Sequence, residues 1–398
     1  MLNLTKEMRI GVIGLGRIGL PSALLFAEVF SEVIGIDKDR ERIACVSALN
    51  MPFQENGLEE KLASSDLRFS PTLCPADLYV IAVSTLELGS NADLRNEGRF
   101  GLTLLVELLG DISDLNPGTP VIIESTLPLG GLATLAEHYA GPLIYCPERV
   151  APGNVFSELA SVRRCIASTS EAGLQFGLSF YDSLSIGVLA STPKVAEMVK
   201  LSENAFRDAN IAFANRLAEI CSEHDIDNRE VVRIANTHPR VHILNSGLGA
   251  GGACLAPSTR SLDRQGLFDE VRKTNQRQIH RALELLVKED IKSVALWGLS
   301  YKGNCDDLRC SPSMDLKALL EVRAIEVKTW DPFAEIGDCL TSLENAQTIV
   351  FGCKHTAFNE PALAQYVREH SSVKIILDVV NATDRSAWEK QEFTYLTV

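Results

Sequence analysis

The sequence lacks an excess of positive charge, and this absence excludes several classes of partner. Its 38 lysines and arginines face 52 aspartates and glutamates, which gives a formal net charge of −14. Such a chain is poorly suited to non-specific binding of nucleic acid or of an anionic membrane surface. Any anionic ligand would therefore need local basic groups or a helix N-terminus.

Paired cysteines and a leader-like apolar run are also missing. The ten cysteines are scattered over 398 residues without a C-x-x-C pair. This argues against a zinc site and against a disulfide framework, so we expect reduced thiols and no metal. The first apolar stretch follows Lys6, Glu7 and Arg9 and is soon broken by glycines, unlike an export signal or a membrane span. We expect a cytoplasmic protein that binds neither membranes nor nucleic acid.

Short apolar runs alternate with helix-like stretches along most of the chain. The runs cover residues 78–84, 119–126, 142–146 and 185–190, and then residues 292–303, 324–332, 347–353 and 373–380. This alternation is typical of a parallel, doubly wound sheet. Residues 193–224 form the longest helical pattern, beginning at Thr192 and Pro193. We predict an α/β fold with two Rossmann-like doubly wound domains, joined by a long central helix and a helical middle domain.

A G-x-G-x-x-G motif occupies residues 14–19, after a predicted strand and at the start of a predicted helix. Asp37 follows Gly19 by 18 residues, at the end of the next apolar run. In this setting the glycines allow a tight turn and a close approach of backbone amides to a pyrophosphate. The residues expected at the cofactor are Gly14, Gly16, Arg17, Ile18, Gly19 and Asp37. The Asp37 carboxylate would accept hydrogen bonds from a ribose and repel a 2′-phosphate, which favours NAD; the alternative is a glycine turn without a ligand.

A second glycine-rich segment, GLGAGGACLAPSTRSL at residues 247–262, places four glycines in the six residues from Gly247 to Gly252, shortly before Cys254. Glycine is costly to order, so such a run indicates a backbone that approaches something closely. Two interpretations are open. The segment is either a flexible loop with a small buried thiol, or it presents a nucleophile at the reacting carbon of a ligand.

Several segments, in a fixed order along the chain, carry a family resemblance. They are GVIGLGRIGLP (11–21), IIESTLPLG (122–130), YCPERVAPGN (145–154), KVAEMVKLSENAFRDANIAFANRLAEI (194–220), ANTHPRV (235–241), GAGGACL (249–255), GLSYKGNCDDLRCSP (298–312) and WDP (330–332). With them the chain resembles the UDP-glucose/GDP-mannose dehydrogenase family nearly from end to end. The likeness is greatest to the branch that oxidises UDP-N-acetylhexosamines such as UDP-N-acetylmannosamine.

The resemblance implies a four-electron oxidation that serves polysaccharide biosynthesis. The C6 primary alcohol of a UDP-sugar becomes a carboxylate through an aldehyde, with two NAD as oxidant. The resemblance also implies three domains: residues 1–190 bind NAD, residues 191–288 form a central helical domain for dimerisation and catalysis, and residues 289–398 bind the UDP part. The long helix with its apolar face indicates a homodimer or a higher homo-oligomer.

Five residues match the catalytic positions of the family. Cys254 matches the nucleophile, whose thiolate adds to the aldehyde as a thiohemiacetal that is oxidised to a thioester and hydrolysed. Lys200 and Asn204, four apart on one helix face, match the pair that binds the sugar and stabilises oxyanions. Glu148 matches the general base for the hydrolytic water, and Thr126 matches a threonine that orients water or substrate. A local structural role is the alternative for each, and most of all for Thr126.

The resemblance also assigns binding residues. Those expected at the substrate are Glu148, Arg149, Val150, Lys200, Asn204, Arg207, Arg240, Gly251, Tyr301 and Lys302. Those expected at the cofactor, besides the glycine motif and Asp37, are Thr85, Thr126 and Arg309. Fixed positive charge suits phosphate recognition, and Arg240 matches an arginine that reaches the substrate from across a dimer. Glu124, within a predicted strand, is expected to be paired rather than catalytic.

The chain departs from the family pattern beside the nucleophile. Ala253 replaces the usual histidine or serine, and Ser258 stands where an aspartate helps to hold the hydrolytic water and keeps the lysine charged. A serine hydrogen-bonds water but carries no charge, so Ser258 is a weakened catalytic candidate. The loop at residues 83–90 lacks the usual V-x-T-P, and Cys310 replaces a common glutamate. Three outcomes stay open: slower hydrolysis, a partial or different oxidation of a modified nucleotide in secondary metabolism, or a non-catalytic protein that binds NAD or a nucleotide sugar.

Overall fold

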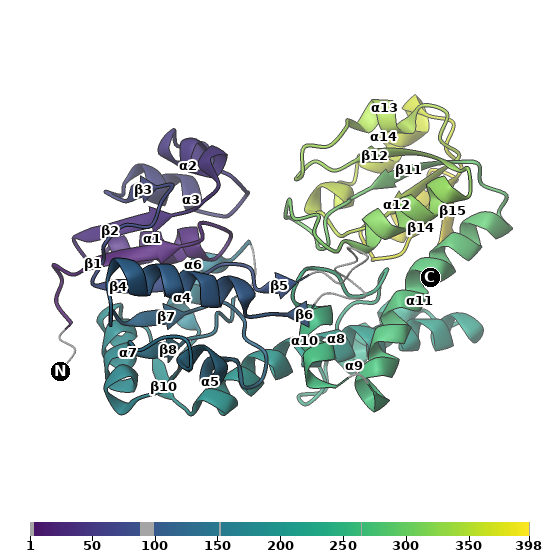
Figure 1. Cartoon of the computed structure of the whole chain (residues 1–398). Helices are drawn as coiled ribbons and strands as arrows, with labels where there is room; N and C mark the ends of the chain where they lie inside the picture. Colours follow the sequence, from purple (N-terminus) through teal and green to yellow (C-terminus); the bar gives the residue numbers. More distant parts are fainter. Residues whose placement is uncertain (1–3, 88–98, 151–152, 264, 398) are drawn as a thin grey trace. The chain divides into compact units, whose positions relative to one another are not determined.

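The computed structural model describes residues 4–87, 99–150, 153–263 and 265–397, which divide into two compact units (Figure 1). Among these residues the first unit ends at Glu203 and the second begins at Asn204, inside one long helix. The three-domain division at residues 190 and 288 stays a prediction. Residues 88–90 of the diverged loop and residues 151–152 of the PERVAPGN segment lie outside the described residues.

The first unit is built on an eight-stranded sheet with the order β10-β9-β8-β7-β4-β1-β2-β3. Its strands are β1 (Arg9–Ile13), β2 (Glu32–Ile36), β3 (Arg68–Ser70), β4 (Leu78–Ile81), β7 (Val121–Ile123), β8 (Leu143–Tyr145), β9 (Arg164–Ser168) and β10 (Val188–Ala190). Neighbouring strands are parallel, as predicted, except that β9 runs antiparallel to β8. Such a reversal toward one edge is common in otherwise parallel doubly wound sheets.

Helices cover both faces of this sheet. They are α1 (Gly19–Ala27), α2 (Arg40–Ser47), α3 (Leu58–Ala63), α4 (Thr103–Leu115), α5 (Gly131–Ala136), α6 (Val155–Ser161) and α7 (Glu171–Ser183). The short strands β5 (Leu86–Glu87) and β6 (Arg99–Phe100) pair with each other antiparallel. Ile10 and Val12 of β1 belong to one core cluster, together with side chains of α1, α3 and α7. Ile13 belongs to the opposite cluster, with α4 and α5. Because both faces are buried, the central strands β4, β7 and β8 are apolar throughout rather than alternating, and the predicted doubly wound architecture is confirmed.

The long predicted helix is α8 (Pro193–Glu223), and it carries polar side chains on a buried face. These buried polar residues are Glu197, Lys200, Asn204, Asp208, Asn215 and Glu219. Their spacing of three, four or seven residues places them along one side of the helix. Glu197 accepts hydrogen bonds from the amides of Gly130 and Leu132 and so satisfies the N-terminus of α5.

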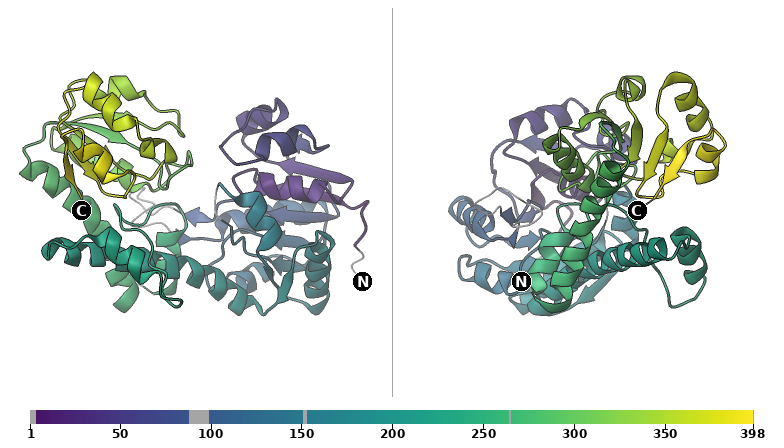
Figure 2. Two further views of the ribbon diagram at one scale, coloured as in Figure 1. Left: turned by 180° about the vertical axis from the view of Figure 1, so that it is seen from behind. Right: turned by 90° about the vertical axis from the view of Figure 1, so that its right-hand side faces the viewer.

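The second unit contains a five-stranded parallel sheet with the order β12-β11-β13-β14-β15. Its strands are β11 (Ser293–Trp297), β12 (Glu326–Trp330), β13 (Thr348–Phe351), β14 (Ile375–Asp378) and β15 (Thr394–Leu396). Its helices are the second part of α8, α9 (Asn228–Ala235), α10 (Leu255–Leu262), α11 (Gly266–Lys288), α12 (Pro312–Val322), α13 (Cys339–Leu343), η1 (Thr356–Asn359), α14 (Leu363–His370) and α15 (Arg385–Glu389). Core clusters again lie on both faces, one with α11 and α12 and the other with α13, α14 and α15. Helices therefore flank each sheet (Figures 1 and 2).

The turns that follow the first strand of each sheet, β1 and β11, are held by the same pattern of hydrogen bonds. The amide of Gly14 donates to the carbonyl of Ile36, and the amide of Leu15 donates to the Asp37 carboxylate. The second sheet repeats this with Gly298 donating to Trp330 and Leu299 to Asp331. An aspartate after the second strand thus fixes the turn after the first strand in both units.

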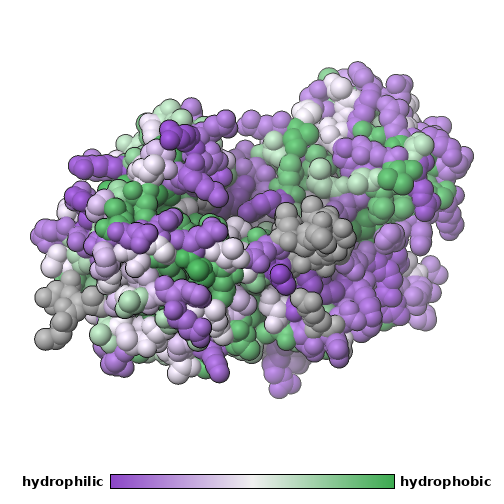
Figure 3. Space-filling model, viewed as in Figure 1, coloured by the Kyte–Doolittle hydropathy of each residue, from purple (hydrophilic) through white to green (hydrophobic). Residues whose placement is uncertain are grey.

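The surface agrees with the acidic composition. The face drawn in Figure 3 is mostly hydrophilic, with hydrophobic residues in separate patches. Among the helices that the structure describes, none combines the length and the apolar character needed to span a bilayer.

Candidate active site

The first glycine turn fits a dinucleotide at three positions. Gly14 has a φ of +92°, and a Cβ there would lie 2.9 Å from the carbonyl oxygen of Ala82. A Cβ on Gly19 would lie 1.8 Å from the carbonyl oxygen of Gly14, so only glycine allows α1 to begin this close to the turn. A Cβ on Gly16 would approach only Arg42, at 3.9 Å. The backbone at Gly16 is therefore open to a ligand, as an approaching pyrophosphate requires.

Asp37 holds this turn and keeps part of its carboxylate exposed. It accepts the Leu15 amide at 2.8 Å and the Asp39 amide at 3.0 Å, and its side chain is 11% exposed. Arg42 forms an ion pair with it at 3.5 Å. These features fit a ribose hydroxyl at Asp37. Of the other residues of the motif, Arg17 lies over the ring of Phe53, and Ile18 is the N-cap of α1.

Two threonines meet at the carboxyl ends of β4 and β7. The Thr85 hydroxyl donates to the carbonyl of Thr126 at 2.6 Å. The Thr126 hydroxyl forms no hydrogen bond with the described residues, so it is available to a ligand. Thr85 follows β4, which pairs with β1, and Thr126 follows β7, the next strand beyond β4. Ligands of open α/β sheets bind at this edge. The structure thus brings Thr85 and Thr126 together at the end of the sheet that carries the glycine turn.

Glu148, which follows β8, is a buried carboxylate with two partners. One oxygen accepts the Val150 amide at 2.7 Å, and the other faces Arg164 at 3.2 Å. Arg164 begins β9 and is only 2% exposed. A buried carboxylate needs such a partner because an unpaired charge in this environment is costly. The pair holds Glu148 in a fixed orientation.

Glu124 lies beside this pair and is itself satisfied. Its oxygens accept the hydroxyls of Ser22 at 2.9 Å and Tyr181 at 2.8 Å. Burial raises the pKa of Glu124, and the Arg164 guanidinium opposes that shift. The pairing predicted for Glu124 is present in the structure.

Arg149, expected at the substrate, is engaged within the first unit. Its guanidinium forms a two-pronged ion pair with Glu203 and donates to the carbonyl of Arg163 at 2.8 Å. The hydrogen bonds to Glu203 raise the pKa of Arg149. The positive charge of Arg149 is therefore balanced within the protein.

Lys200 and Asn204 lie one turn apart on the buried polar face of α8. Lys200 is 9% exposed and forms no hydrogen bond or ion pair with the described residues. A buried ammonium without a protein partner is unusual in a structural role, because its desolvation is uncompensated. Asn204 donates from Nδ2 to the Ser258 hydroxyl at 2.9 Å.

Cys254 is the N-cap of α10 and the one exposed residue among the ten free cysteines, all of which are described. Backbone N–H groups at a helix N-terminus stabilise negative charge, such as that of a thiolate. Gly251 and Gly252, which precede it, pack tightly against the loop after β11 and the start of α12. A Cβ on Gly251 would lie 2.7 Å from Pro312 and 2.9 Å from Tyr301. A Cβ on Gly252 would lie 3.0 Å from the Tyr301 ring, so the dense run allows a close approach to a neighbouring segment rather than flexibility.

Tyr301 and Arg309 surround Cys254 within electrostatic range. Burial raises the pKa of Tyr301, the Cys254 charge acts in the same direction, and the Arg207 charge opposes it. Arg309 forms a bidentate pair with Asp307, at 2.9 and 2.7 Å, which raises the pKa of Arg309. Gly251 packs on Tyr301, and Cys254 lies within electrostatic range of Tyr301 and Arg309, whereas Arg207 acts on Tyr301.

Ser258 uses its hydroxyl within the protein. It accepts from Asn204 and donates to the carbonyl of Cys254 at 2.8 Å, and the residue is fully buried. Lys302 lies beside Tyr301 in the chain and is partly buried. Arg240 is exposed in the loop after α9, and no hydrogen bond or ion pair joins it to Cys254 among the described residues.

A polar cavity of about 420 Å³ lies elsewhere in the second unit, between α9 and the carboxyl ends of β13 and β14. Arg229, Arg233 and Lys354 line it together with Asp384 and several asparagines. The charged lining is therefore positive, although the chain as a whole is strongly negative.

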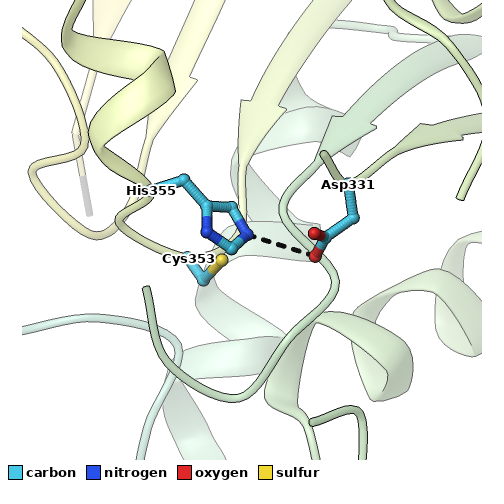
Figure 4. A group of neighbouring side chains, drawn as sticks. All are labelled: Asp331, Cys353 and His355. Atoms are coloured by element: carbon cyan, nitrogen blue, oxygen red, sulfur yellow. Dashed lines mark ion pairs between the residues drawn. The ribbon is translucent and has the colours of Figure 1, made fainter. Parts of the chain in front are cut away.

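Asp331, Cys353 and His355 form a buried group of residue types that bind metals (Figure 4). Asp331 and His355 already have partners within the protein. Asp331 accepts the amides of Leu299 and Phe333 and faces Nε2 of His355 at 3.2 Å. The other ring nitrogen of His355 accepts an amide at 2.9 Å, so Nε2 carries the proton. The group fixes the second turn and is not arranged to hold a metal ion.

Two buried residues that bear on the site, Arg164 and Asp208, were not identified from the sequence. Arg164 precedes an apolar strand, and nothing in the pattern distinguishes it from exposed Arg163. Asp208 offers a signal, because it stands four residues after Asn204 and eight after Lys200 on the same helix face.

Three domain models of one known family match successive parts of the chain. The models of the NAD binding, central and UDP binding domains of the UDP-glucose/GDP-mannose dehydrogenase family match residues 8–185, 194–279 and 295–385. A UDP-N-acetyl-D-mannosamine dehydrogenase from Methanocaldococcus jannaschii is 33% identical, over 97% of this chain and 95% of its own. A second relative of this name, from Pyrococcus horikoshii, is also 33% identical, over 93% of this chain and 95% of its own.

Solved structures give the same picture. The UDP-D-ManNAc dehydrogenase of Pyrococcus horikoshii has a TM-score of 0.87 at 29% identity, covering 98% of this chain and 99% of that one. The UDP-N-acetyl-mannosamine dehydrogenase Cap5O of Staphylococcus aureus has a TM-score of 0.83 at 29% identity, with 98% of each chain covered.

Proposed function

We propose that this chain, a member of the UDP-glucose/GDP-mannose dehydrogenase family, oxidises the C6 alcohol of a UDP-N-acetylhexosamine to the carboxylate. The proposal starts from its family-level activity, that of an NAD-dependent UDP-sugar dehydrogenase. The names of its relatives support UDP-N-acetyl-D-mannosamine as the first substrate to test. The observation that carries the proposal is the exposed thiol of Cys254, at the N-terminus of α10 beside Tyr301 and Arg309.

The reaction needs a nucleophile because it passes through an aldehyde. Bound NAD supplies the oxidant, taking a hydride from C6 in each of two steps. Between these steps the Cys254 thiolate adds to the aldehyde carbon and forms a thiohemiacetal. Oxidation of that adduct leaves a thioester, and water then breaks the carbon–sulfur bond, which releases the carboxylate and returns the thiol. One alcohol and one water thus become a carboxylate, with two hydrides and three protons released.

Three other residues act on the oxygen atoms of these species. Lys200 is buried and has no partner among the described residues, which suits an ammonium that stabilises the oxyanion at C6. Asn204 uses one N–H on Ser258 and keeps the other for the substrate. Glu148, oriented by Arg164, removes a proton from the hydrolytic water.

The nucleotide end of the substrate requires positive charge in the second unit. Lys354 provides it at the polar cavity, because it forms no hydrogen bond or ion pair with the described residues. Arg229 and Arg233 line the same cavity but are paired with Asp378 and Glu230. The match of residues 295–385 to a UDP binding domain supports a nucleotide site in this part of the chain.

We further propose that the chain acts as a homodimer through α8. Phe206 and Phe213 are 68% and 58% exposed, and Ile220 continues the same seven-residue spacing. Large apolar residues in a row on one helix indicate a surface that another protein covers. A second copy of this chain is the partner, because α8 is the helix on which the family resemblance predicts dimerisation.

A second candidate function follows from Ser258. Its hydroxyl is occupied by Asn204 and by the Cys254 carbonyl, and it carries no charge. Hydrolysis of the thioester would then depend on Glu148 alone. In this case the enzyme releases an incompletely oxidised sugar.

Incubation with NAD and a panel of UDP-N-acetylhexosamines tests both candidates. Two NADH per sugar and a product in which two hydrogens are replaced by one oxygen support the full oxidation. One NADH per sugar, or a covalent adduct that persists on Cys254, supports the second candidate. If the C254S variant turned over like the native enzyme, both proposals would be wrong.

A further inference from the structure

The segment that carries Cys254 is attached to α8 by a second set of contacts, separate from the Asn204–Ser258 bond. Asp208 is fully buried on α8 and accepts the Thr259 hydroxyl of α10 at 2.8 Å. It also accepts Nδ2 of Asn275, on α11, at 2.7 Å. One carboxylate therefore joins three helices.

The charge of Asp208 is balanced inside the protein. Arg272 of α11 lies 3.3 Å from both carboxylate oxygens, and both side chains are almost completely buried. A buried ion pair costs much of its attraction in lost hydration, so it is weak evidence for a contribution to stability. Its best-attested benefit is a fixed register between elements. Here the elements are α8, α10 and α11.

The same network fixes the start of the cysteine segment. Asn215, further along the buried face of α8, accepts the Gly247 amide at 2.8 Å and donates to Asn275 at 2.9 Å. A Cβ on Gly249 would lie 2.2 Å from the Asn275 carbonyl oxygen, so the glycine run packs directly on this residue. The segment is held at Gly247 before the nucleophile and at Thr259 after it.

We propose that Asp208 is a positioning residue that sets the place of the Cys254 sulfur through Thr259 and Asn275. The inference rests on the proposed role of Cys254 as nucleophile. Asp208 touches neither substrate nor cofactor, and it acts by preventing α10 from shifting along α8. A shift of about one ångström at a nucleophile is enough to lower a rate by up to two orders of magnitude.

The sharpest test changes the α10 end of the contact. Thr259→Val removes the hydroxyl and keeps the shape, whereas Thr259→Ser keeps the hydroxyl and serves as the matched control. Two readouts are compared: the rate at which iodoacetamide alkylates Cys254, followed by peptide mass spectrometry, and the separate values of kcat and KM. We expect Thr259→Val to lower kcat and the alkylation rate about tenfold, as for loss of one hydrogen bond to a charged group. Thr259→Ser should restore both.

Asp208→Asn is the companion variant. It keeps the shape of the side chain but leaves Arg272 buried without a counter-charge, so its melting temperature is measured alongside its kinetics. NAD affinity is expected to stay native in both variants, because the glycine turn lies in the first unit. Native alkylation and native kcat in Thr259→Val would overturn the inference. That result differs from failure of the proposed function, which is an active C254S variant.

Discussion

At the scale of the residue, two buried carboxylates stand side by side with different surroundings. Glu148 is bound by a guanidinium and an amide, whereas Glu124 is bound by two hydroxyls. Burial raises the pKa of Glu124, and its two hydroxyl partners can each donate or accept a hydrogen bond, so a glutamine should fit the same site. Only Glu148 is assigned a proton transfer. The pair therefore offers an internal control for catalysis.

We expect Glu148→Gln to lower the steady-state rate about a hundredfold or more, because removing a general base typically costs two to four orders of magnitude. Both NADH should still form in a single turnover, and a thioester on Cys254 should accumulate and be visible by mass spectrometry. Glu124→Gln, the matched control, should retain most of the activity. Equal losses in the two variants would contradict the assignment of Glu148.

Ser258 allows the opposite experiment, in which a charge is added. We expect Ser258→Asp to speed thioester hydrolysis, because the new carboxylate would lie beside Asn204 and would help to hold water. Burying that charge should also cost about 1–3 kcal/mol of stability. Single-turnover release of the carboxylate measures the first effect and thermal unfolding the second. Ser258→Ala, which adds no charge, should not speed hydrolysis.

At the scale of the element, the strand–turn–helix–strand unit at residues 9–37 was predictable because steric limits dictate it. Gly14 and Gly19 leave no room for a side chain, and Asp37 receives the amide of the turn. The reversal of β9 was not predictable, since a five-residue apolar strand reads the same in either direction. Arg164 was missed because a sequence does not show which charged residues fold inward, whereas the spacing of Asp208 after Lys200 and Asn204 could have revealed it.

Asp37 is the residue of this strand–turn–helix–strand unit that is predicted to select NAD. We expect Asp37→Ala to raise the KM for NAD about tenfold, through loss of charge-assisted hydrogen bonds to the ribose. The preference for NAD over NADP should narrow, because Arg42 would be freed from its ion pair and could face a 2′-phosphate. Kinetics with both cofactors measure this change. An unaltered ratio would mean that Asp37 serves the turn alone.

The contribution of Asp331 to the stability of the second unit is expected to decrease at acid pH. Burial alone would raise the pKa of Asp331, but hydrogen bonds from His355 and the Ala334 amide hold it below its ordinary value. Its contribution is therefore complete above about pH 4 and is lost as the pH falls further. We expect Asp331→Asn to be less stable by about 2 kcal/mol at pH 7. The gap between the two proteins in urea unfolding should shrink below pH 4, and a gap independent of pH would refute this account.

At the scale of the whole molecule, the apolar row on α8 predicts the oligomeric state. We expect Phe206→Glu combined with Phe213→Glu to halve the mass measured by light scattering, since charges at a contact interface are strongly unfavourable. Val322→Glu, at an 82% exposed position of α12, is the control and should leave the mass unchanged. A native protein that is already monomeric would rule out the dimer.

The two aspartates that hold the glycine turns, Asp37 and Asp331, differ in their exposure to solvent. Asp37 retains a solvent-facing edge, whereas Asp331 is sealed completely by amides and His355. A sugar hydroxyl has access to the first carboxylate and none to the second. Transplanting the turn of one sheet into the other would therefore not transfer cofactor recognition, and the second half must recruit its nucleotide with side chains from other loops.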